Sequence, residues 1–333
     1  MSVSNTTMKV LELNKAGIDF DLIMTEKPIP TLGENEVLVE IEYVALNHLD
    51  AKLAKDGYEV WQYPHVLGLD AVGTIVEAPR GVFPGKGTRV LFQADIAQHG
   101  VLRQFVAVPN HSVCEIPDEL ASDVAVLLPN SGMSALLAME RLDLKKGDSL
   151  AINSAQGAVA HFAIQYAKKK GAKVFAFAQK GHHKRLSQLG ADFVFDCESS
   201  AICETVNLEA GPGGFDCILN TTGGDGFLQD LSNLRFGGRI ACLNGFPMIP
   251  EKMLCLHSPT ISVISVVGAT LSKNLCAQQH LCFIGDRLVD DVCSGYIEAP
   301  ELRHVPFEAE SVKQVLSHLV NRTCEVRPVI KVK

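Results

Sequence analysis

The sequence lacks several features that would place it in other protein classes. It contains no apolar run of the roughly 18 residues that a membrane-spanning helix needs, and its start, MSVSNTTMKV, has no apolar segment typical of a secretory signal. We therefore expect a cytoplasmic protein without a membrane partner. A basic surface is lacking too: 38 acidic residues outnumber 30 basic ones, for a net charge of -8. This balance argues against a nucleic-acid partner.

The ten cysteines lack the spacing of a metal or disulfide framework. All of them lie from Cys114 onward, and no two form a C-x-x-C pair. Without a secretory signal they are expected to be reduced and mostly buried thiols. The sequence therefore predicts no metal site.

The pattern along the chain predicts two domains, as 333 residues are too many for one hydrophobic core. Residues 8–120 contain short, turn-bounded apolar stretches such as 35–46, typical of an all-β region. Residues 123–142 have a helical pattern. Strands then alternate with helices, which is typical of a doubly wound parallel sheet and gives an α/β fold class. The last sixty residues are expected to form two helices (278–297 and 309–321) and two strands (302–307 and 327–333).

The stretch from Ile152 to Lys180 has the order of a dinucleotide-binding unit: apolar run, turn, amphipathic helix, apolar run. The glycine fingerprint G-x-G-x-x-G is replaced by Ala155, Gly157 and Ala160. Gly157 holds the position where a side chain would collide with the pyrophosphate, and the helix start still offers N–H groups to a phosphate. On this motif alone, a nucleotide site and a βαβ unit without ligand are equally well supported.

The residues after the second strand indicate which nucleotide is preferred. NAD sites carry an acid about twenty residues beyond the fingerprint, but Gln179 and Lys180 stand there and His182, His183, Lys184 and Arg185 follow. Positive charge would attract a 2′-phosphate. This favours NADPH over NADH, although a solvated helix face would have the same composition.

Several longer motifs resemble the medium-chain dehydrogenase/reductase family, in its zinc-independent quinone oxidoreductase-like branch. They include "NHLDAKL", "VLGLDAVGTIVEA", "LPNSGMSALLAM", "SAQGAVAHFAIQYAKKKGAKV" and "NTTGGDG", and the resemblance covers nearly the whole chain. It implies a GroES-like β domain formed by residues 1–124 and 272–333. A Rossmann domain with a doubly wound parallel sheet, formed by residues 125–271, would bind NADPH.

The resemblance also implies the site residues. Zinc-dependent members bind catalytic metal through Cys, His and Cys; the matching positions here are Asn47, Leu69 and Asn130, none of which is a thiolate or imidazole. Metal catalysis is therefore not expected. Asp70 stands where zinc enzymes have a Glu, and either a structural hydrogen-bonding role or a place in the site is open to it.

The expected catalytic residues are Asn47, Asp50, Lys52 and Tyr58, with Tyr63 as a further residue of the cleft wall. Asp50 would support Asn47, and it would also suit a helix N-cap. The positions expected to bind NADPH are Asn47, Asn130, Ser154, Ala155, Gln156, Gly157, Ala158, Val159, Gln179, Lys180, Lys184, Thr221, Thr222, Gly223, Asn244 and Gly245.

The implied function is hydride transfer from NADPH to a quinone or an α,β-unsaturated carbonyl, acceptors that need no metal. The alternative is a nucleotide-binding protein with little catalytic activity, used as a sensor or scaffold. We expect a homodimer paired through the strand 260–269, since a long apolar sheet edge must be covered. A monomer whose edge is shielded by residues 268–276 is the other possibility.

Overall fold

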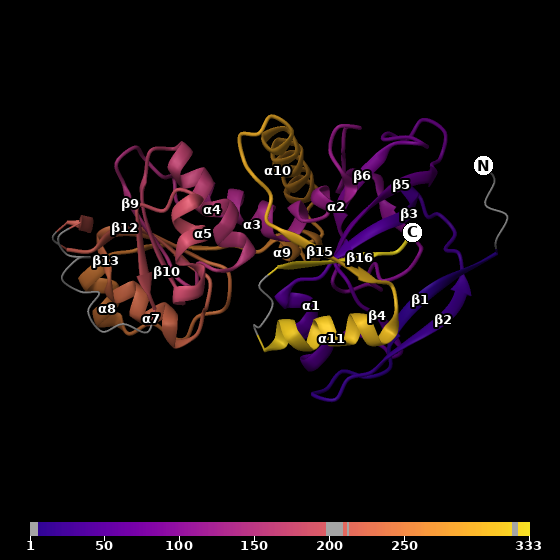
Figure 1. Ribbon diagram of the computed structural model, residues 1–333, viewed down its shortest axis with the longest axis horizontal. Helices are drawn as coiled ribbons and strands as arrows, with labels where there is room; N and C mark the ends of the chain where they lie inside the picture. Colours follow the sequence, from indigo (N-terminus) through magenta and orange to yellow (C-terminus); the bar gives the residue numbers. More distant parts are fainter. Residues whose placement is uncertain (1–5, 198–208, 212, 322–325) are drawn as a thin grey trace. The chain divides into compact units, whose positions relative to one another are not determined.

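A computed structural model describes residues 6–197, 209–211, 213–321 and 326–333 of the chain. The chain divides into two compact units, one formed by Met1–Met133 with Val266–Lys333 and the other by Ser134–Ser265 (Figure 1). The fold classes are those expected, a GroES-like unit and a Rossmann-like unit with a parallel sheet. The functional boundaries at 124/125 and 271/272 stay a prediction.

The GroES-like unit contains two mainly antiparallel sheets. One has the strand order β2-β1-β4; the other has the order β15-β16-β3-β5-β6-β8, and β7 also pairs with β3. The strands are β1 (Thr7–Leu13), β2 (Leu22–Pro28), β3 (Glu36–Ala45), β4 (His65–Val66), β5 (Asp70–Glu77), β6 (Arg89–Gln93), β7 (Phe105–Pro109), β8 (Val113–Glu115), β15 (Leu302–Pro306) and β16 (Arg327–Lys331). Residues from both ends of the chain thus share one sheet, because β16 pairs with β3.

This unit also contains helices. They are α1 (His48–Asp56), η1 (Asn110–Ser112), α2 (Ser122–Ala125), the π-helical turn η2 (Leu128–Gly132), α9 (Val266–Leu271), α10 (Leu275–Cys293) and α11 (Ala309–Val320). α11 packs against α1 (Figure 1). The core is mainly aliphatic and joins strand residues such as Leu11, Val39 and Ile41 to Leu316 of α11.

The helix α1 corrects the expectation that residues 8–120 are all β. Asn47 is its N-cap, and Asp50, three residues on, accepts a hydrogen bond from the Asn47 N–H at 2.7 Å. This reciprocal arrangement is the capping box that starts helices. Ala51 and Ala54 are fully buried on its inner face. The N-cap is thus Asn47, whereas Asp50 is the third helical residue.

The Rossmann unit contains one six-stranded parallel sheet in the order β11-β10-β9-β12-β13-β14. Its strands are β9 (Ser149–Ile152), β10 (Lys173–Ala178), β11 (Phe193–Asp196), β12 (Phe215–Asn220), β13 (Leu234–Cys242) and β14 (Thr260–Val263). The order reverses between β9 and β12, and parallel sheets bind ligands at the carboxyl ends of the strands where such a reversal occurs. The fingerprint turn follows β9, so it lies at this reversal.

The helices of the Rossmann unit connect these strands. They are α3 (Met133–Arg141), α4 (Ala158–Lys169), η3 (Lys180–His182), α5 (His183–Gln188), α7 (Asp225–Ser232) and α8 (Glu251–His257). The single helical pattern expected over 123–142 is instead divided into α2, η2 and α3. Pro129 explains the break, because proline has no N–H and its ring clashes with the preceding turn.

The strand expected over 260–269 is shorter than predicted. β14 ends at Val263, and the chain forms α9 from Val266. The neighbouring strand β13 ends at Cys242, whose carbonyl accepts a last hydrogen bond from Ile264. Beyond that point the chain has no ladder partner, so the strand cannot continue. β14 does form the edge of the sheet, as expected.

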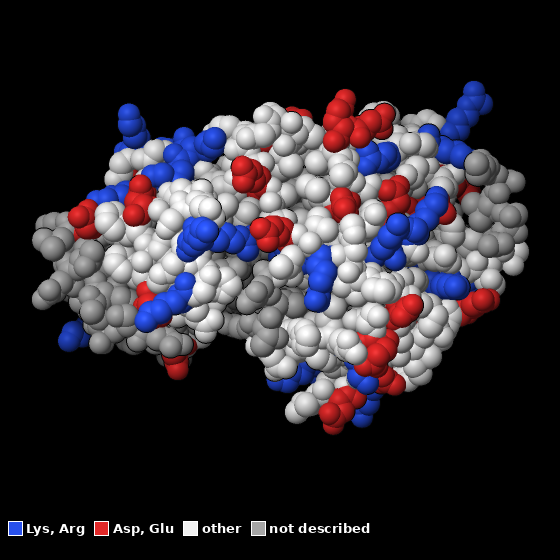
Figure 2. Space-filling model, viewed as in Figure 1, with Lys and Arg blue, Asp and Glu red and all other residues white. Residues whose placement is uncertain are grey.

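The cysteines are less buried than the sequence indicates. Of the eight described ones, Cys114, Cys217 and Cys242 are buried, while four others are exposed. Charged side chains of both signs are interspersed on the face drawn in Figure 2. Within the described ranges, no helix combines the length and the apolar character that crossing a bilayer would require.

Candidate active site

A buried carboxylate, Asp70, is the centre of a hydrogen-bond network in the GroES-like unit. Asp70 begins β5 and is 1% exposed. One of its oxygens accepts from Asn47 Nδ2 at 2.7 Å and from the Asn130 backbone N–H at 3.1 Å. The other accepts from Gln93 Nε2 at 3.3 Å. Three separate segments of the chain therefore converge on one side chain, which holds each of them in register.

The side chain of Asn47 is fixed at both of its polar atoms. Its NH2 group faces Asp70, while its Oδ1 accepts from the Arg327 guanidinium at 2.9 Å and from Ser131 Oγ at 3.4 Å. The same Arg327 nitrogen also lies 3.3 Å from the Leu46 carbonyl. Because a donor-only partner lies on one side and an acceptor on the other, the amide of Asn47 can adopt one orientation only.

A second buried carboxylate, Asp50, lies in the same network. It is fully buried and bonds to the Asn47 backbone N–H through one oxygen. Its other oxygen, Oδ1, has no hydrogen-bond partner among the described residues. A buried acceptor without a partner is costly, and such groups are concentrated at functional sites.

Burial shifts both carboxyl groups toward their protonated forms. It raises the pKa of Asp50 to about 6, against hydrogen bonds from backbone N–H groups and the charge of Arg327. Burial, and then the nearby charge of Asp50, raises the pKa of Asp70 to about 7. Asp70 can therefore gain or lose a proton near neutral pH, which is unusual for an aspartate and typical of a functional site.

The positions that hold zinc in metal-dependent members of the resembled family belong to this network. Asn47 and Asn130 are both bonded to Asp70, and Asn130 Oδ1 also accepts from Gln93 at 3.2 Å. Leu69, at the third position, is buried against Leu53 and Ile96. Amides and a leucine are not zinc ligands, so these residues do not fit a catalytic zinc ion.

Two of the expected catalytic residues are not joined to the network by any hydrogen bond within the described residues. Lys52 is exposed on α1. Tyr58 is half-buried, and its ring meets Trp61 edge-on with centroids 6.3 Å apart. Their roles stay predictions. Tyr63 is 39% exposed.

The fingerprint turn of the Rossmann unit leaves space for a ligand. Gly157 is the N-cap of α4, and a Cβ built there would meet no atom closer than Ser154 O at 3.8 Å. Ser154 adopts a positive φ of 47°, and the buried Ala155 donates its N–H to Phe177 O at 2.9 Å. The altered first residue of the fingerprint is thus accommodated by hydrogen bonding across to β10.

The donors and acceptors at this turn fit a dinucleotide. The N–H groups of Ala158 and Val159 lie in the first turn of α4, which a helix leaves without partners of its own. Gln156 Oε1 is buried and has no hydrogen-bond partner within the described part of the chain. The space at Gly157 and the N–H groups at the start of α4 suit a pyrophosphate. The Gln156 Oε1 could accept a hydrogen bond from a ribose hydroxyl.

The turns after β9, β12 and β13 are bonded to one another. Thr221 donates its N–H to Asn153 Oδ1 at 2.7 Å, and Asn244 Nδ2 donates to the Thr221 carbonyl at 2.7 Å. Gly223 has a positive φ of 70°, and a Cβ there would lie 2.6 Å from Gly245 O. The expected residues Thr221, Gly223, Asn244 and Gly245 therefore form one surface at the strand ends, with Thr222 beside Asn153 at 3.3 Å.

A partly buried acid, Asp230, is hydrogen-bonded to residues at these turns. Asp230 of α7 accepts from Asn220 Nδ2 at 2.7 Å and from Asn153 Nδ2. Burial raises the pKa of Asp230 to about 6. These contacts tie the residues that follow β9 and end β12 to the helix α7.

The expected basic residues after β10 are not equivalent. Gln179 and Lys184 are exposed, and Lys180 Nζ lies 3.6 Å from Asp196. Arg185 instead bonds to His161 Nδ1 of α4 at 3.0 Å. Lys180 and Lys184 are therefore the exposed lysines of this segment that a negatively charged group in solvent could approach.

Sequence reasoning missed Gln93 and Arg327 in the first network and Asn153 and Asp230 in the second. Asn153 directly follows a predicted strand, and that position is a usable signal. Arg327 has no comparable signal, since it contacts a residue 280 positions away.

The chain matches known proteins over both units. Residues 33–118 match the family described as alcohol dehydrogenase GroES-like domain, and residues 158–280 match the family described as zinc-binding dehydrogenase. Trans-enoyl reductase tndF of Aspergillus flavipes is 30% identical over 68% of this chain and 71% of its own length. The putative quinone oxidoreductase YhfP of Bacillus subtilis is 26% identical over 86% and 88%.

A solved structure supports the same fold. The structure of mycobacterial Rv1454c complexed with NADPH superimposes with a TM-score of 0.83 at 21% identity, covering 97% of this chain and 99% of that one. The chain therefore belongs to the medium-chain dehydrogenase/reductase family, in its quinone oxidoreductase-like branch. It is a reductase.

Proposed function

We propose that this reductase works without zinc and transfers hydride from NADPH to a quinone or an α,β-unsaturated carbonyl. The observation that carries the proposal is the network of Asn47, Asp70 and Asn130, which occupies two of the three metal-ligand positions with amides held by a carboxylate. With leucine at the third position, the site offers hydrogen bonds but no metal to polarise a carbonyl. Conjugated acceptors take up hydride without that polarisation.

In this proposal the Rossmann unit holds NADPH, which supplies the hydride when bound. The N–H groups at the start of α4 bind the pyrophosphate, and Gly157 leaves room for it. Lys180 and Lys184 attract the 2′-phosphate. The turns at Thr221–Gly223 and Asn244–Gly245 line the approach to the nicotinamide half. The NADPH in the structure of mycobacterial Rv1454c supports this choice of cofactor by analogy.

Asn47 is the proposed catalytic residue of the GroES-like unit. Its amide uses one N–H for Asp70, and no second acceptor for this NH2 group is recorded among the described residues. The remaining N–H is therefore available to a polar atom of the cofactor or the acceptor. Asp70 and Arg327 act as positioning residues, because they fix the amide orientation. Asp50 holds the backbone of Asn47.

The acceptor class rests on acceptor chemistry and on the relatives. The names of the relatives include a trans-enoyl reductase and a quinone oxidoreductase, and both substrate types are conjugated carbonyl compounds. The test is NADPH oxidation with a panel of quinones, enones and simple aldehydes, followed by the loss of nicotinamide absorbance. We expect turnover with the first two groups and none with aldehydes. Tight NADPH binding without any turnover would instead support a sensor or scaffold.

Two variants separate the proposed catalytic groups. Asn47→Ala should lower kcat by roughly 100-fold, a loss typical of one oriented hydrogen-bond donor. Lys52→Ala should leave kcat near the wild-type value, because the exposed Lys52 has no bond to the network. Equal losses in both variants would contradict this assignment.

The zinc-free mechanism has its own test. Turnover should be unchanged after dialysis against a strong chelator, because no step uses a metal. Activity that disappears with the metal and returns with added Zn2+ would overturn the mechanism.

The proposal includes a homodimer paired through β14. This strand is the edge of the parallel sheet, and Val263 on it is 64% exposed. Pairing with a second copy would satisfy its outward-facing backbone groups.

A further inference from the structure

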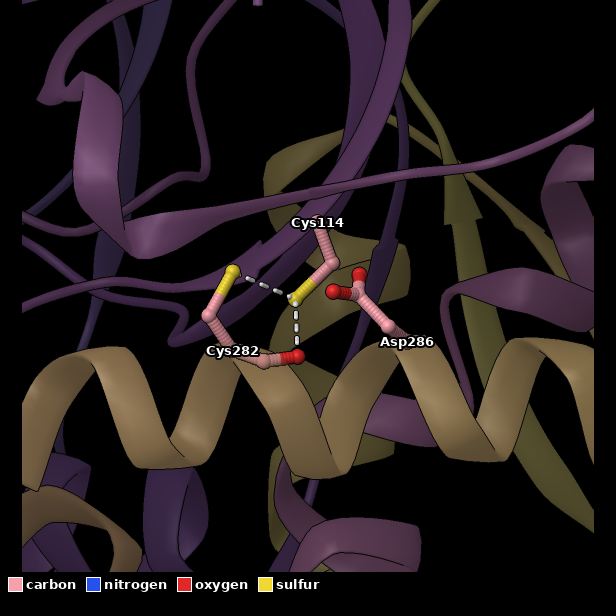
Figure 3. A group of neighbouring side chains, drawn as sticks. All are labelled: Cys114, Cys282 and Asp286. Atoms are coloured by element: carbon pink, nitrogen blue, oxygen red, sulfur yellow. Dashed lines mark hydrogen bonds between the residues drawn. The ribbon is translucent and has the colours of Figure 1, made fainter.

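Two cysteines that are distant in sequence lie in contact in the GroES-like unit. Cys114 of β8 and Cys282 of α10 have their Sγ atoms 3.3 Å apart (Figure 3). Each thiol also donates to a carbonyl of the other's segment, Cys114 to Cys282 O at 3.4 Å and Cys282 to Val113 O at 3.0 Å. Cys114 is buried and Cys282 is partly exposed. The pair is therefore held in place and can be reached from solvent on one side.

An aspartate completes the group. Asp286 follows Cys282 by one helical turn of α10, so both side chains lie on the same face of the helix, toward Cys114 (Figure 3). The two sulfur atoms and a carboxylate oxygen of Asp286 all lie within 4.8 Å of one another. Within the described residues, this is the one group of three such side chains close enough to share a metal ion.

The residue between the two helical ligands creates the space for Cys114. A Cβ built on Gly285 would lie 2.5 Å from Cys114 Sγ and 2.7 Å from the Met133 methyl group. Any side chain at this position would push Cys114 off the helix. Gly285 thus permits the close approach of β8 to α10 that brings the three ligand atoms together.

The surroundings favour a cation. Glu115 and Asp290 add negative charge next to Asp286. A cavity of about 30 Å3 is lined by Cys114 and Cys282, and its other polar lining residues include Ser112, Gln278 and Gln93 of the Asp70 network. It is large enough for a water molecule, so a fourth ligand can approach from this side.

We propose that Cys114, Cys282 and Asp286 form a binding site for a thiophilic divalent cation of the Zn2+ class, and none of these three ligands belongs to the Asp70 network. Two thiolates and a carboxylate are a ligand set that zinc accepts, with water in the fourth position. The two thiols give up their protons to solvent when the ion binds. A tetrahedral ion with Zn–S bonds of about 2.3 Å separates its sulfur ligands by roughly 3.7 Å. The observed pair needs to open by only a few tenths of an ångström.

The experiment measures zinc uptake by the reduced, full-length chain after removal of metal. Titration against a chromophoric chelator should give one tightly bound Zn2+ per chain. Cys114→Ser and Cys282→Ser should each weaken binding by at least about 100-fold, and Asp286→Asn by about tenfold. Cys293→Ser is the matched control, since it removes an exposed thiol of the same helix and should bind like the wild type.

A second measurement guards against misfolded variants. Co2+ bound to the wild type should give the charge-transfer absorption of thiolate ligands, and the exposed Asp286→Asn change should retain that band at higher Co2+ concentration. Failure of the reduced chain to bind zinc would overturn the proposal, and so would unchanged binding in the Cys114→Ser, Cys282→Ser double variant. A Cys114–Cys282 disulfide formed with hydrogen peroxide in a chain that binds no metal would make the pair a redox couple instead. Uptake is measured without substrate, so its outcome is independent of the reductase function.

Discussion

Each unit contains an aspartate that accepts hydrogen bonds from amide side chains, and the two networks differ in how they are built. In the Rossmann unit, Asp230 joins Asn153 and Asn220, which follow or end neighbouring strands of one sheet. In the GroES-like unit, Asp70 joins Asn47, Gln93 and Asn130, and Arg327 approaches from the far end of the sequence. The first network is the result of sheet topology. The second is assembled across the chain.

The difference between the two networks suits two different roles, structural support of turns for the Asp230 network and, in our proposal, catalysis for the Asp70 network. The Asp230 network holds turns so that backbone N–H groups can meet a ligand. The Asp70 network includes a second acid, Asp50, with an unbonded oxygen, and a cation. A network with excess buried charge is costly to maintain, so the proposed role of Asn47 would give this cost a function.

The largest expected effect concerns the open turn above the Asp230 network. Gly157→Val should weaken NADPH binding by at least about 100-fold, because a branched side chain would fill the empty space beside Gly157 where the pyrophosphate approaches. Fluorescence titration measures it. Gly17→Val is the control, since a Cβ built on that glycine also meets no close contact, with no atom within 4 Å, but Gly17 lies in the other unit. Retained binding would mean that the cofactor does not use this turn.

The next largest effect is on the pH dependence of stability, in which Asp70 and Asp230 can be compared directly. Burial, and then the charge of Asp50, raises the pKa of Asp70 to about 7, so the folded chain keeps a proton that the unfolded chain has lost. The contribution of the Asp70 carboxyl to the free energy of unfolding therefore falls as the pH rises from about 4 to about 7. Asp70→Asn should remove the decline, gaining on the order of 2 kcal/mol over the wild type between pH 5 and pH 8.

Urea unfolding at both pH values measures this gain, and Asp230→Asn provides the comparison. The pKa of Asp230 is raised only to about 6, so its variant should gain roughly half as much over the same range. Equal pH dependence in the wild type and Asp70→Asn would show that Asp70 is not the titrating group.

A smaller effect is expected from removing the positive charge of Lys184, which follows β10, and it tests the preference for NADPH. Lys184→Gln should weaken NADPH binding by about tenfold, or about 1.4 kcal/mol, and leave NADH binding unchanged. The reason is that only NADPH carries a 2′-phosphate. Lys146→Gln changes another lysine of the Rossmann unit and should affect neither cofactor. Tighter binding of NADH than NADPH by the wild type would refute the cofactor choice.

The smallest effect lies at the sheet edge of the Rossmann unit. The Ile264 N–H points inward to Cys242, and N–H directions alternate along a strand, so that of Val263 points outward. Val263→Pro should thus remove a donor from a shared ladder while keeping the sheet, and shift dimer toward monomer by roughly 1 kcal/mol. Sedimentation equilibrium measures the shift. A wild type that is monomeric at micromolar concentration would exclude this interface.

The sequence predicted best what is encoded locally. Alternating apolar segments and the turn around Gly157 were enough for the Rossmann sheet and α4. The helix α1 was also within reach, because Asn47 and Asp50 have the spacing of a capping box. The strand at Thr260 was predicted too long because its length depends on where its neighbour β13 ends, which periodicity does not reveal.

Contacts between distant segments could not be predicted in this way. Cys114 and Cys282 lie 168 positions apart, so no spacing rule for metal ligands finds them. No local motif marks Arg327 in the sequence, yet its guanidinium donates a hydrogen bond to Asn47 Oδ1. Family motifs placed Asn47 and Asn130 at the site, whereas the atoms that hold them came only from the fold.

The pairing of β16 with β3 also has a consequence for protein synthesis. A ribosome completes residues 134–265, the whole Rossmann unit, before it adds Arg327. Domains tend to fold as units while the chain emerges, so the Rossmann unit can form while β3 still lacks a neighbour. Until then Asp50 and Asp70 have no guanidinium nearby. The Asp70 network is thus completed only after the whole Rossmann unit has been synthesised.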